Sequence, residues 1–311
     1  MTSETTSGLR AFGLTLAFVT GMLVATQSRI NGELGSRLGN GVVAALISFG
    51  TGLILLGLVM LVNRKLRARM RDVWAALRAH RLAPWQLMGG FSGAFLVVSQ
   101  GVTVTAIGVA SFTVAVVGGQ LLSGLWVDRI GLGPAGKAPI TRNRAIGAVV
   151  VVFAVVLASA GGLGGAGASI LFVLLPALAG IGLAWQQAVN GQVAVIGGPI
   201  VAATVNFLAG TAALLVVCLV VVLARGLPTA LPTQPWLYVG GAIGVVFIAT
   251  AAVVVRWVGV LLLGLASIAG QLAGAVLLDV VVPTGGGLTV LQIVGCALTL
   301  VGVGIAAVRL R

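Results

Sequence analysis

Residues 21–52 read GMLVATQSRINGELGSRLGNGVVAALISFGTG, and residues 180–210 read GIGLAWQQAVNGQVAVIGGPIVAATVNFLAG. The second stretch repeats the residue order of the first. The matched residues are Gln27 with Gln186, Asn31 with Asn190, Gly32 with Gly191, Gly39 with Gly198 and, once one residue is dropped, Ala44 with Ala202 and Phe49 with Phe207. Internal similarity of this kind indicates two copies of one structural unit.

A second block of matches follows at a constant shift. It pairs Gly89, Gly90 and Gly93 with Gly240, Gly241 and Gly244, Gly119-Gln120-Leu121 with Gly270-Gln271-Leu272, and Asp128 with Asp279. Any single match is expected by chance in a glycine-rich chain, whereas an ordered set indicates duplication. We therefore expect two units, residues 1–165 and residues 166–311.

The composition is that of a protein surrounded by lipid. Hydrophobic residues make up 59% of the 311 residues and charged residues only 7%, whereas soluble domains have about 25% charged residues because their surface faces water. The 47 glycines suit helices that pack closely in a bilayer. The net charge of +13 does not indicate nucleic-acid binding, because the basic residues flank apolar stretches as they do in membrane proteins.

Apolar stretches of about 20 residues, the length that crosses a bilayer, predict ten transmembrane helices. Their expected ranges are 10–31, 42–62, 86–106, 109–127, 145–161, 170–190, 200–224, 237–256, 260–280 and 288–308. Continuous apolar runs are divided at turn-forming sequences, namely Ile107-Gly108-Val109, the glycine-rich residues 161–167 and Arg256-Trp257-Val258-Gly259. The first helix is expected to be retained rather than cleaved as a signal peptide.

Lysine and arginine predict the orientation. With the N-terminus in the cytoplasm, only Arg29, Arg37 and Arg225 of the 18 basic residues lie outside, so the positive-inside rule places both termini in the cytoplasm. Because five crossings is an odd number, the second unit enters the membrane in the opposite sense to the first. The expected fold is therefore an all-α integral membrane protein with two inverted five-helix repeats. Many secondary transporters have this architecture, and their halves rock around a site at the membrane midplane.

The repeated motif resembles the YdcZ-like branch of the drug/metabolite transporter superfamily. The residues that carry the resemblance are Gln27, Asn31, Gly32, Ala44, Ala45, Ser48, Phe49 and Gly52. The second half repeats the pattern with Asn206 and Phe207 in place of the Ser-Phe pair. The resemblance implies a bacterial inner-membrane protein of ten helices, with both termini cytoplasmic, that exports small metabolites or drug-like solutes.

Amide side chains inside the predicted helices are the candidate substrate contacts, because a polar group in lipid needs a partner or a cavity. Gln27 and Asn31 are four residues apart and share a helix face, and Gln186 and Asn190 repeat this spacing. The predicted topology places the first pair near the outer mouth and the second near the inner mouth. They either line the pathway and form alternate gates, or bond neighbouring helix ends and loops.

Four further residues are candidate substrate contacts. Gln120 and Gln271 are expected near the midplane, where they either line a substrate cavity or bond a facing helix. Gln100 aligns with Ala251, so it can supply the asymmetry that a substrate without twofold symmetry needs. Trp185 either forms an aromatic wall of the site or lies at the membrane interface.

Residues 63–84 predict a short amphipathic helix on the cytoplasmic surface. Its apolar residues recur at helical spacing, with arginines largely on the other side. Anionic lipid headgroups are attracted to such a segment. We therefore expect membrane lipids as partners at residues 63–84.

The scarcity of ionisable residues inside the predicted spans limits which substrates and reactions are expected. No Asp, Glu, His or Lys lies near the middle of a predicted span, so a small neutral or amphipathic solute is the expected substrate, and neither a cofactor nor a metal is expected. The alternatives to a transporter are a non-transporting partner subunit or a channel. A membrane-embedded enzyme is less favoured, because the sequence has no arrangement of nucleophile, base or metal ligands. An oligomer is compatible with the sequence.

Overall fold

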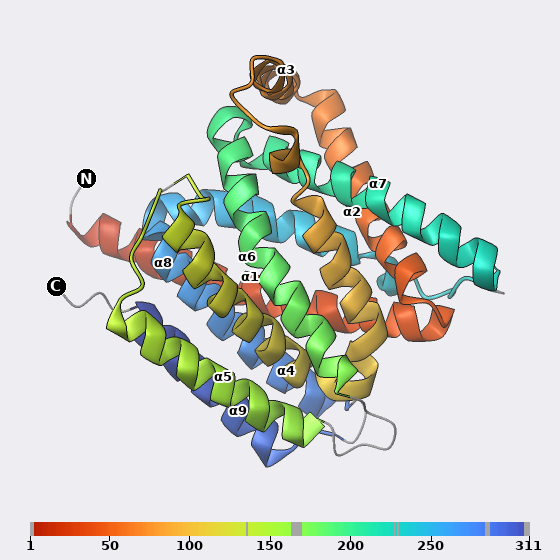
Figure 1. Ribbon diagram of the computed structural model, residues 1–311, viewed down its shortest axis with the longest axis vertical. Coiled ribbons are helices and arrows are strands. Elements are labelled where there is room, and N and C mark those ends of the chain that lie inside the picture. Colours follow the sequence, from red (N-terminus) through yellow and green to blue (C-terminus); the bar gives the residue numbers. More distant parts are fainter. Residues whose placement is uncertain are drawn as a thin grey trace.

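The computed structural model describes residues 3–134, 136–162, 170–226, 228, 230–283 and 287–307. In these residues all regular secondary structure is helical, as the sequence predicts. The helices are α1 (Ser3–Leu38), α2 (Gly41–Val62), α3 (Arg64–Arg78), η1 (Pro84–Leu87), α4 (Gly90–Ile130), α5 (Arg142–Gly162), α6 (Leu171–Gly197), α7 (Pro199–Arg225), η2 (Pro235–Tyr238), α8 (Gly240–Val281) and α9 (Val290–Ala307). Figure 1 shows the long helices packed side by side, with α3 at one end of the molecule.

Within the described part of the chain, eight helical stretches are long and apolar enough to cross a membrane. They are Ala11–Leu38, Gly41–Val62, Pro84–Ile130, Arg142–Gly161, Leu171–Gly197, Pro199–Ala224, Leu263–Val281 and Val290–Ala307, and Gly240–Ala251 is a shorter apolar helix. The expected helical membrane protein is therefore confirmed. The predicted glycine-rich connection lies, beyond Gly162, outside the described residues, and so does the expected boundary between the two units.

Two helices are longer than the sequence predicts. α1 continues past Asn31 to Leu38, and α6 continues past Asn190 to Gly197. An Asn-Gly pair inside a helix costs only about 1–2 kcal/mol relative to alanine, and packing against neighbouring helices offsets this cost. Asn31 and Asn190 therefore lie about two helical turns inside their helices rather than at the ends.

The matched glycines Gly39 and Gly198 end these two helices. Their φ angles are 60° and 80°, a left-handed region that glycine enters without steric cost. The next helix begins at once in each case. The side chain of Asn40 accepts hydrogen bonds from the first amides of α2, and Pro199 occupies the first turn of α7.

α4 is broken at Gly108, where the sequence predicts a turn. Gly108 has φ 81° and ψ 162°, so the helix that starts after it has free amide groups. Asp279 of α8 accepts hydrogen bonds from the backbone N of Val109 (3.0 Å) and of Ala110 (2.7 Å). A carboxylate is favourable at a helix N-terminus, and this one is only 3% exposed.

The two limbs of α4, residues 90–107 and 109–130, run in opposite directions along α6. The contacts of the first limb pair Gly182 with Ser92 and Asn190 with Gly89, and those of the second limb pair Gly180 with Val116 and Ala188 with Val127. As the residue number rises along α6, the number of the facing residue falls along the first limb of α4 and rises along the second. The chain therefore turns back at Gly108, and Figure 1 shows the two limbs on either side of α6.

α8 is folded back in the same way along α1. The contacts of its first part pair Gln27 with Gly244 and Asn31 with Gly240, and those of its second part pair Phe18 with Gly270 and Met22 with Gly274. The direction of α8 relative to α1 therefore reverses between Gly244 and Gly270. The break that the sequence predicts at residues 256–259 falls within this interval.

Glycines allow the backbones of these helix pairs to touch. A Cβ atom added at Gly119 would lie 2.0 Å from the carbonyl oxygen of Ala177, and one added at Gly270 would lie 1.9 Å from that of Phe18. α5 and α9 form a separate pair, visible at the lower left of Figure 1. There a Cβ atom at Gly147 would lie 2.4 Å from the carbonyl oxygen of Gly302.

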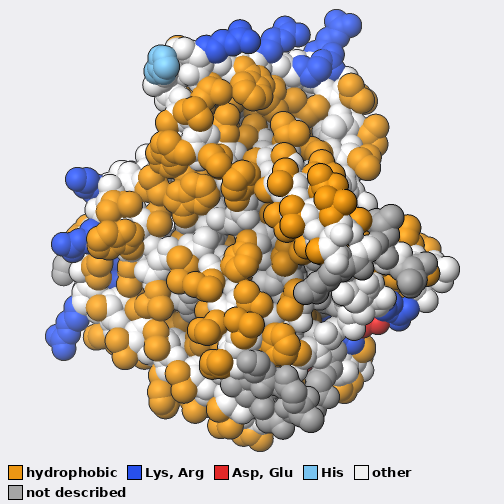
Figure 2. Space-filling model, turned by 45° about the vertical axis from the view of Figure 1, so that its right-hand side comes forward, with side chains coloured by type: hydrophobic (Ala, Val, Ile, Leu, Met, Phe, Trp, Pro, Cys, Tyr) orange, Lys and Arg blue, Asp and Glu red, His pale blue; other side chains and the backbone are white. Residues whose placement is uncertain are grey.

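α3 is the expected amphipathic helix, and its most buried side chains contact protein. Val73 (1% exposed) and Ala76 (0%) pack against Val193 of α6 and Val201 of α7. The basic side chains of α3 face outward. Figure 2 shows Lys and Arg gathered at the end of the molecule where α3 lies, above a flank covered by apolar side chains.

Candidate functional site

One hydrogen-bonded chain of side chains joins α1 to the first limb of α4. The Nδ2 of Asn31 donates to the Oε1 of Gln100 at 2.7 Å, and the Nε2 of Gln100 donates to the Oγ of Ser28 at 2.9 Å. All three side chains are buried, with Asn31 0% exposed. The Oδ1 of Asn31 has no hydrogen-bond partner. We call Ser28, Asn31 and Gln100 the first amide cluster.

A second cluster joins α6 to α7. The Oδ1 of Asn206 accepts hydrogen bonds from the Nε2 of Gln186 (3.0 Å) and from the Nδ2 of Asn190 (2.9 Å). The Oε1 of Gln186 is buried without a hydrogen-bond partner. We call Gln186, Asn190 and Asn206 the second amide cluster. Each cluster thus has one buried carbonyl oxygen that can still accept a hydrogen bond.

Matched glycines provide the space for both clusters. A Cβ atom at Gly240 would lie 2.4 Å from the Oδ1 of Asn31, and one at Gly89 would lie 2.7 Å from the Oδ1 of Asn190. Gly244 faces the Nε2 of Gln27 and Gly93 faces that of Gln186, each at 3.1 Å from its Cβ position. The glycine neighbours of Gln27 and Asn31 are therefore repeated at Gln186 and Asn190, the positions that the sequence repeat pairs.

The rings of Phe49 and Phe207 meet between the two clusters, with centroids 5.0 Å apart and planes inclined by 36°. Phe207 fills the space beside Gly52 of α2, and Phe49 fills the space beside Gly210 of α7, where added Cβ atoms would lie 2.2 and 2.3 Å from the rings. Phe49 also contacts Gly93, next to Gln186. The polar clusters are thus separated by an aromatic contact at the α2–α7 interface.

The other predicted site residues lie apart from this arrangement. Gln120 donates to the Oε1 of Gln187 at 3.1 Å on an exposed surface. Gln271 and Trp185 are partly buried, and the backbone N of Gln271 lies beside Gly21. The structure therefore brings together Gln27, Asn31 and Gln100 in one region and Gln186 and Asn190 in another.

A protein-family model described as "Putative inner membrane exporter, YdcZ" matches residues 12–157 and 171–305. The chain belongs to this family. The match covers nearly the whole length and confirms the resemblance seen in the motif residues. Together with the apolar helices, it establishes a multi-pass inner-membrane protein of a transporter family. No curated protein matches the chain.

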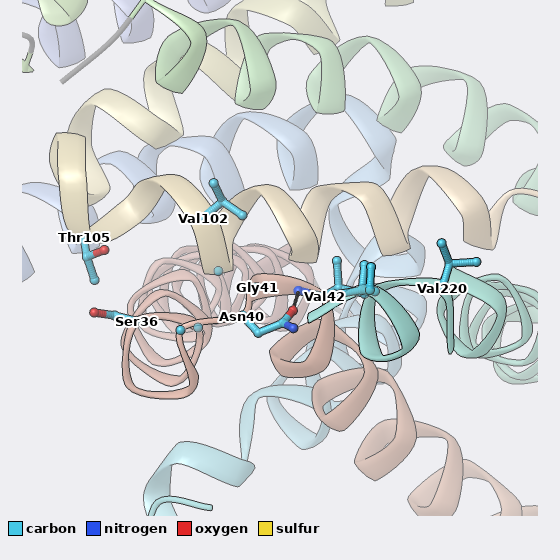
Figure 3. A pocket seen from close by; sticks show the side chains of 12 residues that line it. Ser36, Asn40, Gly41, Val42, Val102, Thr105 and Val220 are labelled. Atoms are coloured by element: carbon cyan, nitrogen blue, oxygen red, sulfur yellow. Dashed lines mark hydrogen bonds between the residues drawn. The ribbon is translucent and has the colours of Figure 1, made fainter. Parts of the chain in front are cut away.

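The YdcZ-family chain has a cavity of about 540 Å³ close to the first amide cluster. Its lining residues are Gly35, Ser36, Gly39, Asn40, Gly41, Val42, Gly101, Val102, Thr105, Val220, Val221 and Ala224. Figure 3 shows α1, α2, the first limb of α4 and α7 around it, with the Ser36 and Thr105 hydroxyls among the lining groups. The cavity is otherwise mostly apolar, because valines and glycine backbone form its walls.

Three polar residues of this YdcZ-family chain were not predicted as site residues. Ser28 and Asn206 complete the two clusters, yet single small polar residues are common in membrane helices and give no distinct signal. Asn206 was noted only as the replacement of Ser48 in the repeat, although the change to an amide side chain was a usable signal. Gln292 of α9 donates to the Oγ of Ser111 at 2.9 Å, beside the break at Gly108. No described group of three or more His, Cys, Asp or Glu residues is arranged to hold a metal ion.

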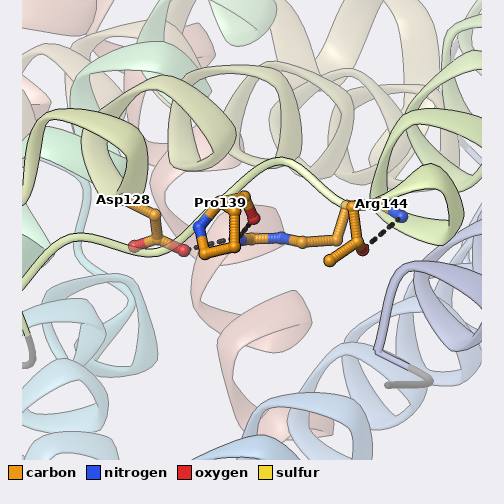
Figure 4. Close-up of polar contacts among 4 residues, drawn as sticks. Asp128, Pro139 and Arg144 are labelled. Atoms are coloured by element: carbon orange, nitrogen blue, oxygen red, sulfur yellow. Dashed lines mark hydrogen bonds and ion pairs between the residues drawn. The ribbon is translucent and has the colours of Figure 1, made fainter. Parts of the chain in front are cut away.

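The matched aspartates of this YdcZ-family chain differ in their environment. Asp279 is buried against the N-terminus that follows Gly108, whereas the side chain of Asp128 is 48% exposed and forms an ion pair with Arg144. Figure 4 shows Arg144 reaching both Asp128 and the carbonyl oxygen of Pro139. Exposed ion pairs contribute about 0–1 kcal/mol. Asp128 therefore contributes less to stability than its repeat partner.

Proposed function

We propose that this protein is a secondary transporter that exports a small neutral or amphipathic solute by alternating access. The membership of the YdcZ exporter family carries the proposal. In this proposal the broken helices α4 and α8 each cross the membrane twice. The chain then crosses ten times, as two inverted five-helix repeats.

The matching contacts of the two halves support the inverted repeat. α1 packs on α8, and the matched helix α6 packs on α4, through glycines at paired positions such as Gly21 and Gly180. A Cβ atom added at Gly21 would lie 2.2 Å from the carbonyl oxygen of Ser267, and one added at Gly180 would lie 2.1 Å from that of Val116. If α1 moves together with α8, and α6 together with α4, the two bodies can rock against each other without losing these contacts.

The orientation in this proposal has both termini in the cytoplasm. It places the basic helix α3 inside, where lysine and arginine are favoured. The first amide cluster then lies toward the outer side and the second toward the inner side. Gln27, Asn31, Gln186 and Asn190 are accordingly proposed to line the pathway at its two ends.

The polar groups of both clusters support a solute that forms hydrogen bonds. The Oδ1 of Asn31 and the Oε1 of Gln186 are buried acceptors without partners, and such a group costs about 1–3 kcal/mol. A substrate hydroxyl, amide or amine hydrogen would satisfy it. The clusters contain no charged side chain, which favours neutral over ionic solutes.

Replacing Gln186 by leucine is expected to reduce transport about tenfold, because it removes a hydrogen-bond donor of the second cluster. Gln27→Leu should have a similar effect in the first half. The measurement is counterflow in liposomes, with a substrate selected from a metabolite panel by thermal stabilisation of the protein. Gln187→Leu is the matched control, since its side chain is exposed and bonds only Gln120 among the described residues. Normal counterflow in both test variants would remove these residues from the pathway, and non-saturable flux in the wild type would indicate a channel.

Anionic lipid is expected to stabilise the protein through α3. Lys65, Arg69 and Arg71 are exposed on this helix, and each basic residue near an anionic surface contributes about 1 kcal/mol. The melting temperature should rise when phosphatidylglycerol replaces phosphatidylcholine in nanodiscs, and the rise should shrink in Lys65→Gln/Arg71→Gln. Arg225→Gln, which alters the arginine that ends α7, should leave this rise unchanged. An equal rise in all three proteins would rule out a lipid site at α3.

A further inference from the structure

The two halves differ in the packing of their first helices. α1 packs closely on α4, whereas the matched helix α6 makes no comparable approach to α8 in the described residues. Along α1, Gly32 lies against Val104 and Gly35 against Gly101, where added Cβ atoms would be 2.7 and 2.2 Å from the facing atoms. Gly41, at the start of α2, continues this close packing against Val102. We call this contact the α1–α4 seam.

The matched part of α6 has other neighbours. A Cβ atom added at Gly191, the counterpart of Gly32, would lie 3.0 Å from the side chain of Pro134, which follows α4. Gly197 meets Val73 of α3 and Val201 of α7. The inner end of α6 is therefore held by α3 and by the segment after α4 rather than by α8.

The hydrogen bonds of the matched residues Asn31 and Asn190 also go to different helices. Asn31 is bonded across the seam to Gln100, and Gln100 is bonded back to Ser28. The residue that matches Gln100 in the second half is Ala251, which has no group to bond Asn190. Asn190 bonds Asn206 of α7 instead.

We propose that Gln100 is a positioning residue whose hydrogen bonds to Asn31 and Ser28 hold α1 against α4 and so keep the outer side closed. We call these two bonds the latch. In this structure the outer side is closed by the latch, and the inner side has alanine, Ala251, at the matched position. This inference rests on the proposed alternating access. In the opposite state the halves exchange their packing, so α6 closes on α8 while the α1–α4 seam opens. Because only the outer side has the latch, the outer-closed state is the more populated one. Each interhelical hydrogen bond in a membrane favours its state about threefold, so the two bonds of Gln100 favour it about tenfold.

Cross-linking of paired cysteines tests the proposal without a known substrate. Ser36→Cys/Val102→Cys places two thiols on the cavity beside the seam, as Figure 3 shows. Val195→Cys/Val253→Cys is the matched pair in the second half, and all four positions are exposed. The background carries Cys218→Ala and Cys296→Ala, which remove the native thiols. With a short bifunctional methanethiosulfonate reagent in liposomes, the outer pair should react faster than the inner pair.

Removing the latch should change that ratio. Gln100→Ala is expected to lower the outer-to-inner ratio of cross-linking rates about tenfold. The reverse variant, Ala251→Gln, offers Asn190 a partner and should raise the rate of the inner pair, which keeps the test informative if Gln100→Ala folds poorly. A purely structural role of Gln100 would lower the melting temperature and leave the ratio unchanged. Equal rates of the two pairs in the wild type, or a ratio unaffected by both variants, would overturn the proposal.

The outcome is distinguishable from a failure of the proposed function. Saturable counterflow with an unchanged ratio would reject the latch and leave the transporter standing. A ratio that shifts as expected, in a protein that shows no counterflow with any solute of the panel, would reject the transporter and leave the latch between two states of the helices.

Discussion

Alanine at Gly90 or Gly241 is expected to lower the free energy of unfolding by about 1–3 kcal/mol, the usual cost of overpacking. A Cβ atom at Gly90 would lie 1.9 Å from the carbonyl oxygen of Asn206, and one at Gly241 would lie 2.0 Å from that of Ser48. These oxygens belong to helix backbones, which cannot move aside as a side chain can. Thermal unfolding in detergent, followed by size-exclusion chromatography, measures the loss.

The chain offers matched controls for this prediction. Gly50, Gly57 and Gly264 have open space where a Cβ atom would be added, so their alanine variants should be as stable as the wild type or slightly more stable, since alanine favours helix. Gly50 and Gly57 lie on α2, the helix that Gly241 contacts. Equal melting temperatures for the test and control variants would contradict the close approach of these helices.

Replacing Asp279 by alanine is expected to destabilise the protein by about 2–6 kcal/mol. The change leaves the amide groups of Val109 and Ala110 without acceptors in a buried place, at about 1–3 kcal/mol for each unpaired group. The effect should appear as a lower melting temperature and as faster hydrogen exchange of the residues that follow Gly108.

Asp128→Ala is the natural comparison, because Asp128 occupies the matched position in the first half. Its partner Arg144 is near the surface, so the variant should lose about 0–1 kcal/mol. Asp279→Asn retains one acceptor oxygen and should fall between the two. If Asp128→Ala were the more damaging variant, the assignment of Asp279 as the cap of the second limb of α4 would be wrong.

Much of this architecture was predictable because lipid imposes a simple rule on sequence. Apolar stretches must be helical to satisfy their backbone groups, so a helical membrane protein could be predicted from hydropathy. The break in α4 was predictable from Gly108, since only glycine adopts its φ without strain. The family resemblance rested on a short motif around Gln27 and Asn31, and the family match confirmed it.

The pairing of the polar side chains could not be predicted. Gln120 and Gln271 were expected either to line a substrate cavity or to bond a facing helix, because neither spacing nor depth in the membrane determines which neighbour a given helix face meets. Gln120 bonds Gln187 of the facing helix α6 on an exposed surface. Ser28 of α1 became part of the site because α4 packs beside α1, and Asn206 of α7 because α6 packs beside α7. Hydropathy and spacing along one helix do not show these contacts between helices.

The packing of α1 against α8 also bears on how the protein is made. During synthesis α1 leaves the ribosome first, but the glycines that receive Phe18 and Met22 are near residue 270. The first helix must therefore remain in the bilayer with its contact face covered only by lipid until most of the chain has been translated. Assembly of the first half cannot be completed before the second half arrives, so a chain truncated before α8 should be recognised by the cell as unassembled.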